Sequence, residues 1–203
     1  MTTEIGGVLC ANITNRGYLD STLTKSRYTL LRRSFNEIAY RSIEQFRQHI
    51  DPEETFYADV LHGDLLVAIG GDNAAESISR LALALKQSWK ESTLAKELRK
   101  LGNHSYVNRR MDLSIGLGLG LLDLSLNPFT SKPIMGWYPK LIREIQGLAE
   151  SCAPRSLILV TTEVREAAQE ANLGMRFGKP VNPIPDASGL SIYPVLSYPK
   201  LAA

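Results

Sequence analysis

Two short apolar segments, separated by three turn-forming residues, constrain the fold of this 203-residue chain more than any other feature. The segments are TFYADVL (55–61) and LLVAIG (65–70), with His62, Gly63 and Asp64 between them. Apolar runs of this length, joined by Gly and Asp, predict a β-hairpin. Asp64 then lies at the hairpin turn, where it serves either as an ordinary turn residue or as a carboxylate for chemistry.

The remaining pattern predicts a mixed α/β (α+β) chain of the order β-α-β-β-α-β with appended elements, which is the ferredoxin-like split βαβ plan. The other predicted elements are, in chain order, a strand in GGVLCANIT (6–14), a helix over 21–50, a helix over about 74–92, a continuation or second helix in LAKELRKL (94–101), a strand in MDLSIGLGLGLLDL (111–124), a helix over about 137–152, a strand in SLILVTT (156–162), a helix in TEVREAAQEA (162–171) and an edge strand in LSIYPVL (190–196). The alternating glycines of 111–124 indicate close backbone approach, or a bend near a ligand. Gly70, Gly71 and Asp72 are expected to connect a strand to a helix.

Composition excludes several classes of protein. The formal net charge is only +2, so a DNA- or RNA-binding domain is not indicated. Cys10 and Cys152 are the only cysteines, which favours reduced thiols over a disulfide framework. No leader peptide and no membrane-spanning apolar run is recognisable. We therefore expect a single domain over residues 1–203, located in the cytoplasm, with no membrane partner.

With these segments in order, the sequence resembles the class III nucleotidyl cyclase catalytic domains over nearly its whole length. The segments that carry the resemblance are LCANI (9–13), HGDLLVAIG (62–70), NAAESISRLALALKQS (73–88), LSIGLGLG (113–120), GWYPKLIREIQGLAES (136–151) and LILVTTEVREAA (157–168). The resemblance implies the ferredoxin-like βαββαβ cyclase fold. It also implies that a nucleoside triphosphate is converted to a 3′,5′-cyclic nucleotide and pyrophosphate, with two Mg²⁺ or Mn²⁺ ions.

The metal site that this resemblance implies comprises Asp64, Asn12 and the adjacent Ile13. Asn12 stands where the family has its first metal-binding aspartate, and an amide binds divalent cations poorly. Three explanations remain open: an inactive relative, a deliberate aspartate replacement, or a misalignment. A catalytically degenerate homologue that binds nucleotide or dimerises is therefore the alternative function, and a palm-type polymerase relative is a third.

Other family positions also depart from the pattern. The transition-state asparagine and arginine align with Lys140 and Glu144, although Lys140 and Arg143 keep positive charge on that helix and are the candidate catalytic residues. They stabilise phosphate charge or belong to a solvated helix face. The turn TNRG (Thr14, Asn15, Arg16, Gly17) is the candidate triphosphate site or a plain loop.

The residue that reads a purine in the family aligns with Val60, so the purine code is missing. The resemblance therefore points to the bacterial anti-phage cyclases that make cyclic CMP or cyclic UMP. In that group a bulky tyrosine excludes purines, and Tyr57 is the counterpart here unless it simply packs in the core. The family also implies a head-to-tail homodimer, in which Asp64 of one chain faces Lys140 of the other.

Overall fold

The computed structural model describes residues 3–50, 55–61, 64–104, 112–123, 138–152, 157–181 and 191–199. The strands in these ranges are β1 (Thr3–Ile13), β2 (Phe56–Leu61), β3 (Asp64–Gly70), β4 (Leu113–Asp123), β5 (Ile158–Thr161), β6 (Arg176–Phe177) and β7 (Ile192–Ser197). The helices are α1 (Arg16–Thr22), α2 (Lys25–Arg47), α3 (Ala74–Glu91), α4 (Thr93–His104), α5 (Tyr138–Cys152) and α6 (Thr162–Glu170).

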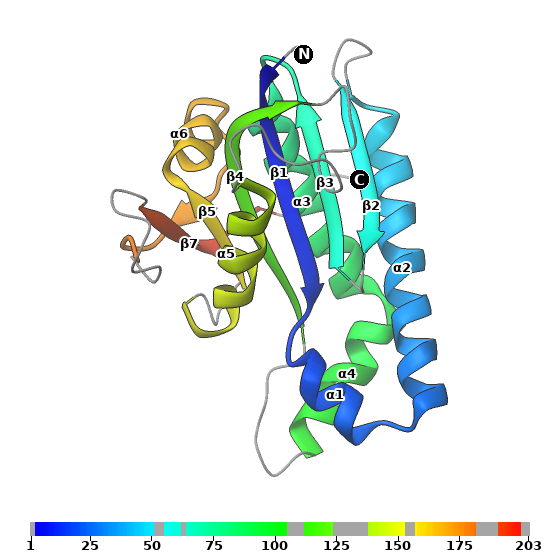
Figure 1. Cartoon of the computed structure of the whole chain (residues 1–203). Helices are drawn as coiled ribbons and strands as arrows, with labels where there is room; N and C mark the ends of the chain where they lie inside the picture. Colours follow the sequence, from blue (N-terminus) through cyan, green and yellow to red (C-terminus); the bar gives the residue numbers. More distant parts are fainter. Residues whose placement is uncertain are drawn as a thin grey trace.

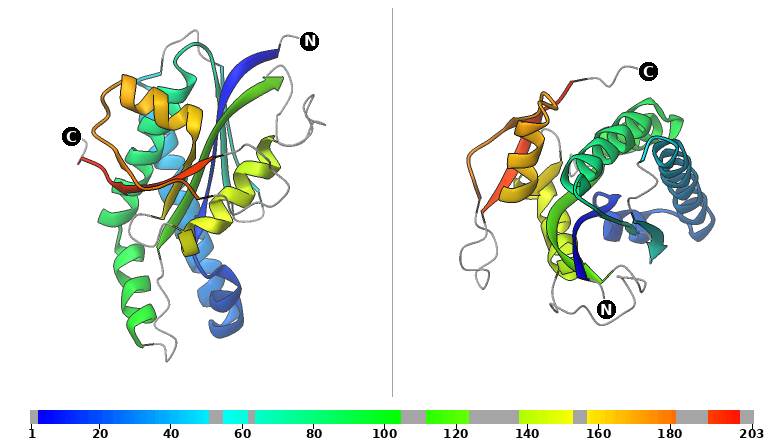
Figure 2. Two further views of the ribbon diagram at one scale, coloured as in Figure 1. Left: turned by 90° about the vertical axis from the view of Figure 1, so that its left-hand side faces the viewer. Right: turned by 90° about the horizontal axis from the view of Figure 1, so that it is seen from above.

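These strands form one sheet in the order β2-β3-β1-β4-β5-β7-β6, which is antiparallel except where β4 runs parallel to β5. The predicted mostly antiparallel, ferredoxin-like sheet with appended elements is confirmed. Figures 1 and 2 show α2, α3 and α6 on one face of the sheet and α5 on the other. The short helix α1 and the end of α4 lie beyond the carboxyl end of β1.

Each face of the central strands buries its own set of apolar side chains, as the two-residue period of a strand requires. On β1, Leu9, Ala11 and Ile13 belong to the core under α2 and α3. Val8 and Cys10 belong to the second core, under α5. Asn12 continues this second face, so the alternation along β1 directs its side chain toward α5.

The predicted helix over residues 21–50 is divided in the structure. Leu23 and Thr24 adopt extended backbone angles between α1 and α2, so the chain turns there before the long helix begins at Lys25. Of the two alternatives for residues 94–101, the second helix is confirmed, because Ser92 is extended and α4 begins as a separate helix at Thr93. Periodicity alone did not separate these helices, because their apolar positions continue across the breaks.

One strand assignment was wrong. Residues 190–196 were expected to form an edge strand, yet the strand found there, β7, lies between β5 and the short strand β6. Phe177 pairs with Val195, and Gly178 donates its backbone N–H to the carbonyl of Pro194 at 2.8 Å. A two-residue strand has no sequence periodicity, so β6 and its covering of β7 were not foreseeable from the pattern.

The 70–72 segment connects β3 to α3 as predicted, with Gly71 at φ 114°, a conformation that favours glycine. The hairpin residues His62 and Gly63 lie outside the described residues, and so do the side chains of Cys152 and Lys140. None of the helices in the described ranges combines the length and apolarity needed to cross a bilayer.

Candidate functional site

The carboxyl end of β1 and the start of β3 bring Asn12 and Asp64 into contact. The two strands are antiparallel, and the pairing of Ala11 with Leu65 places residues 12 and 64 side by side on the α5 face. The Asn12 Nδ2 group donates a hydrogen bond to Asp64 Oδ1 at 3.0 Å. Asp64 is only 7% exposed, so its carboxylate requires partners within the protein.

Two arginines supply those partners. Arg16, the first residue of α1, places its Nη1 atom 3.1 Å from Asp64 Oδ1, and Arg143 of α5 places Nε 3.5 Å from Asp64 Oδ2. Their side chains remain 40% and 47% exposed, whereas the carboxylate between them is largely buried. Two arginines thus share one carboxylate at this position.

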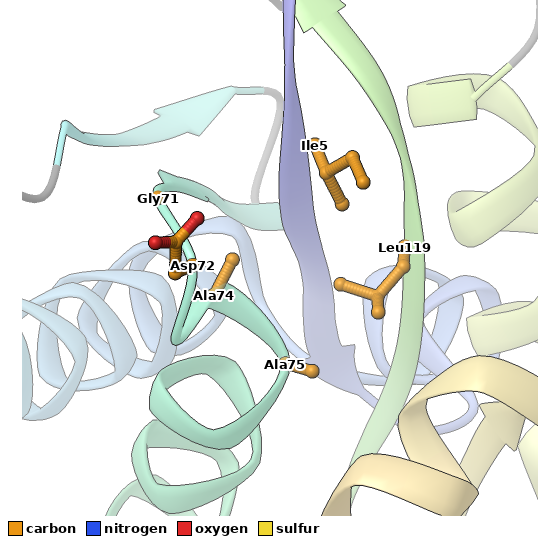
Figure 3. Close-up of a pocket in the computed structure, with 6 residues that line it drawn as sticks. All are labelled: Ile5, Gly71, Asp72, Ala74, Ala75 and Leu119. Atoms are coloured by element: carbon orange, nitrogen blue, oxygen red, sulfur yellow. The ribbon is translucent and has the colours of Figure 1, made fainter.

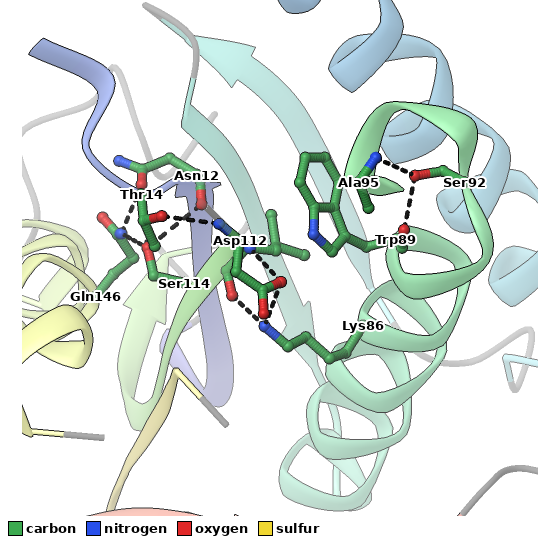
Figure 4. Close-up of polar contacts among 10 residues, drawn as sticks. Asn12, Thr14, Lys86, Trp89, Ser92, Ala95, Asp112, Ser114 and Gln146 are labelled. Carbon is green, nitrogen blue, oxygen red and sulfur yellow. Dashed lines mark hydrogen bonds and ion pairs between the residues drawn. The ribbon is translucent and has the colours of Figure 1, made fainter. Parts of the chain in front are cut away.

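The Asn12 amide is held from its other side by two further donors, which Figure 4 shows together. Gln146 of α5 donates from Nε2 to Asn12 Oδ1 at 2.7 Å, and Ser114 of β4 donates from Oγ to the same oxygen at 3.1 Å. Gln146 also donates to the Ser114 hydroxyl. With its oxygen fixed by these two donors, the amide must direct its N–H group at Asp64.

The close approach of α5 that permits this network depends on a glycine of β4. A Cβ atom at Gly116 would lie 2.6 Å from the Ile142 carbonyl oxygen and 2.7 Å from the Gln146 backbone nitrogen. Of the two alternatives for the glycines of 111–124, close backbone approach is confirmed at Gly116. Without a side chain at this position, the helix backbone comes near enough for Gln146 to reach Asn12.

Cys10 lies one step along the same face of β1 and has no disulfide partner. Burial raises the pKa of its thiol to about 12, and the nearby Asp64 carboxylate adds to the rise, while Arg143 and Arg16 oppose it. The thiol is therefore protonated at neutral pH, which makes it an inert core group rather than a nucleophile or a metal ligand.

No protein-family model and no curated protein matches this sequence. Solved structures do. The fold is similar to that of the adenylyl cyclase CyaB from P. aeruginosa, with a TM-score of 0.70 and 14% identity over 99% of this chain and 98% of that one. The chain has the class III nucleotidyl cyclase fold. It is also similar to a dimeric guanylyl cyclase domain from Blastocladiella emersonii, with a TM-score of 0.62 and 12% identity over 98% of this chain and 100% of that one. A guanylate cyclase domain from Catenaria anguillulae, solved in complex with GTP, gives a TM-score of 0.57 and 14% identity over 98% of this chain and 100% of that one.

The donor set at Asp64 does not fit the two divalent cations that this cyclase fold implies. Asp64 Oδ1 already accepts a hydrogen bond from Arg16, and Oδ2 forms an ion pair with Arg143. The Asn12 N–H group points at the carboxylate where a metal ligand would have to present a lone pair. The Ile13 side chain packs in the opposite core. Within the described part of the chain, no group of three or more His, Cys, Asp or Glu side chains could hold a metal ion.

The other predicted residues are placed as follows. Thr14 and Asn15 form the turn after β1, with Asn15 in the left-handed region at φ 54°, while Arg16 and Gly17 begin α1. Tyr57 of β2 is half-buried and packs against the α5-side core, on the same face of the sheet as Asp64. Its partner in the sheet is Ala68, so Tyr57 lies four residues along β3 from Asp64.

Sequence reasoning brought Asp64, Asn12 and Arg16 to one end of the sheet but missed four polar residues that hold them. The missed residues are Ser114 and Gln146, described above, together with Lys86 of α3 and Asp112 before β4, all of them buried. The sequence pattern could have indicated Lys86, because this lysine interrupts the apolar face formed by Leu81, Leu85 and Trp89.

A separate hollow of about 230 Å³ lies at the opposite end of the sheet, as Figure 3 shows. Its lining residues are Ile5, Gly71, Asp72, Ala74, Ala75 and Leu119. Most of these side chains are small or apolar, and Asp72 is the one charged residue among them. Because none of the residues around Asp64 lines this hollow, the hollow is separate from the candidate site.

Proposed function

We propose that this chain is a catalytically degenerate member of the class III cyclase fold, which binds the phosphates of a nucleoside triphosphate without requiring divalent cations. The observation that carries the proposal is the convergence of Arg16 and Arg143 on the Asp64 carboxylate. In this arrangement the positive charge at the site comes from protein side chains.

The two arginines have the chemistry that a triphosphate needs. A guanidinium group presents several N–H donors in a planar fork, which suits phosphate oxygens, and Asp64 holds both groups at one place. Each arginine side chain is roughly half exposed, so a phosphate group can approach it from solvent. Two guanidinium groups at one position attract an anion. Thr14, Asn15 and Gly17 are the neighbours of Arg16 in the chain. We propose that they contribute to phosphate binding at the place where the two arginines meet.

The loss of cyclisation follows from the side chains that replace the family's catalytic groups. The Asn12 N–H group donates a hydrogen bond at the place where a metal ligand would have to donate a lone pair. Lys140 and Glu144 stand where the resemblance expects an asparagine and an arginine. Arg143 remains on that helix, but its Nε atom contacts Asp64 of the same chain. These substitutions preserve anion binding better than they preserve metal-dependent chemistry.

The test is equilibrium binding of ATP, GTP, CTP and UTP by calorimetry, in excess EDTA and then with Mg²⁺ or Mn²⁺. We expect binding in EDTA, weakened roughly 10- to 100-fold by Arg143→Met, which corresponds to a charged hydrogen bond of about 1.5–3 kcal/mol. Arg33→Met is the matched control, because Arg33 pairs with Glu37 on the exposed side of α2 and the net charge changes equally. Absence of triphosphate binding in EDTA would contradict the proposal, as would equal weakening by the two variants.

A second candidate, favoured by Tyr57, is a pyrimidine nucleotide cyclase. Tyr57 is half-buried on the Asp64 face of β2, where an aromatic ring could limit the size of a base. Mass analysis of products from the four triphosphates with Mn²⁺ decides between the candidates. Cyclic CMP or cyclic UMP would establish the second, while a linear dinucleotide would indicate polymerase-type chemistry. A role in anti-phage signalling belongs to this second candidate alone.

A homodimer remains a prediction as well. The similar Blastocladiella emersonii domain is described as dimeric, which supports dimerisation of this chain. The predicted contact between Asp64 of one chain and Lys140 of the other involves a side chain outside the described residues. Light scattering at tens of micromolar protein tests the oligomeric state directly. The single-domain organisation and the cytoplasmic location also stay predictions.

A further inference from the structure

Lys86 is a charged residue enclosed in the core. Its side chain is 1% exposed and extends from the apolar face of α3 toward the start of β4. The Lys86 Nζ group lies 3.2 Å from Asp112 Oδ1 and also donates to the Leu113 carbonyl. A buried ion pair loses hydration on both sides, so an apolar residue on this helix face would serve stability at least as well. A contribution to stability therefore does not by itself explain why Lys86 and Asp112 are paired here.

Asp112 connects this ion pair to the turn after β1, as Figure 4 shows. Its backbone N–H donates to Thr14 Oγ1 at 2.9 Å, and its carbonyl accepts from the Thr14 N–H at 2.8 Å. Its carboxylate also accepts from the Leu113 N–H at 2.7 Å. Residue 112 is thereby held by Lys86 on one side and holds Thr14 by two reciprocal hydrogen bonds on the other.

Thr14 is itself 1% exposed, and only Asn15 separates it from Arg16. Since one residue links Thr14 to the first residue of α1, a rotation of the backbone at Thr14 would move the start of α1 and with it the Arg16 guanidinium group beside Asp64. The distance of 3.1 Å between Arg16 and Asp64 thus depends on how firmly Thr14 is held.

We propose that Lys86, Asp112 and Thr14 form a positioning relay, which runs from the core of α3 to the 14–17 turn and fixes Arg16 for phosphate binding. Lys86 and Asp112 act through Thr14 and do not need to touch the ligand. The relay rests on the nucleotide binding proposed above, and it adds positioning residues that stand outside the arginine pair.

The test compares Thr14→Val, which keeps the shape of the side chain but removes the acceptor oxygen, with the rescuing variant Thr14→Ser. We expect Thr14→Val to bind triphosphate in EDTA about tenfold more weakly, with a smaller loss for the monophosphate, and Thr14→Ser to bind nearly as the parent does. Ser79→Ala is the control, since Ser79 is a buried α3 residue whose hydroxyl donates to the Ala75 carbonyl.

A second measurement does not require a ligand. Amide hydrogen exchange of the 14–17 turn is expected to accelerate in Thr14→Val and in Lys86→Met, and to stay unchanged in Ser79→Ala. Unchanged exchange in Thr14→Val would overturn the relay even if nucleotide binds. So would equal losses of affinity in Thr14→Val and Ser79→Ala. Failure of the parent protein to bind nucleotide, together with faster exchange in Thr14→Val, would instead remove the proposed function and leave the relay as a structural device only.

Discussion

Replacing Asn12 by aspartate tests the electrostatics of the site directly. In the structure the Asn12 Nδ2 atom lies 3.0 Å from Asp64 Oδ1. A carboxylate at position 12 would place two like charges at that separation, a repulsion of about 5 kcal/mol at an effective dielectric constant near 20. The hydrogen bond from the amide to the Asp64 carboxylate, about 1.5–3 kcal/mol, would also be lost.

Other contacts offset part of this cost. Gln146 and Ser114 would continue to donate to an oxygen at position 12, and Arg16 and Arg143 would be attracted to the added charge. We therefore expect Asn12→Asp to lower the free energy of unfolding by about 2–4 kcal/mol in EDTA at pH 7. A control variant, Asn73→Asp, adds the same charge at an exposed position before α3 and is expected to change stability by less than about 0.5 kcal/mol.

The assay is urea unfolding in EDTA, followed by unfolding in a titration with Mn²⁺. Two carboxylates in contact would form a cation site, so Mn²⁺ is expected to stabilise Asn12→Asp, by about 2.7 kcal/mol at one hundred times the dissociation constant. The parent protein is expected to gain much less. If Asn12→Asp is as stable as the parent in EDTA, residues 12 and 64 are not in contact. If Mn²⁺ stabilises both proteins equally, the metal-free interpretation of the site is wrong.

Two further predictions address the packing around the site. Gly116→Ala should destabilise the protein by more than about 3 kcal/mol, because the added Cβ would overlap the α5 backbone, whereas Gly147→Ala, with open space at its Cβ, should be neutral or stabilising by up to about 1 kcal/mol. Thermal unfolding of the two variants would refute this if their order were reversed. Since the pKa of Cys10 rises from 9.0 to about 12 on folding, the folded state holds this proton more tightly, and stability is lost as the pH rises above 9, by about 1.4 kcal/mol per unit. Cys10→Ala should remove that part of the alkaline slope, and an identical slope between pH 9 and 10.5 would contradict the assignment.

Local pattern was sufficient to predict the central strands, through the apolar run in 6–14 and the hairpin over 55–70. The meeting of Asn12 with Asp64 followed from the resemblance to the cyclase family, which places the first strand beside that hairpin. Gln146 could not be predicted in the same way. Its contact with Asn12 depends on how closely α5 approaches β4, and that distance is set by the absence of a side chain at Gly116.

The relay and the small strand β6 were missed for different physical reasons. Lys86 does appear in the sequence as a charge on an apolar helix face, but its partner Asp112 lies 26 residues away, just before another element. Long-range pairing of this kind leaves no periodic signal. The strand β6 consists of two residues, and the edge position predicted for β7 was wrong because no pattern of that length can be recognised.

The surroundings of Asn12 also bear on why an asparagine stands at that position. An amide has one accepting and one donating end, and here both are used, with Gln146 and Ser114 donating to the oxygen and the nitrogen donating to Asp64. A carboxylate would have no donor for Asp64 and would need a cation between the two groups. In the parent protein, which has Asn12, Arg16 and Arg143 already neutralise the charge of Asp64. The site is thus complementary to an amide at several contacts, which supports the proposal that arginine side chains supply the positive charge at this position. On that proposal we expect Asn12→Asp alone to form no cyclic nucleotide from any of the four triphosphates with Mn²⁺, and a cyclic product in the mass analysis would refute it.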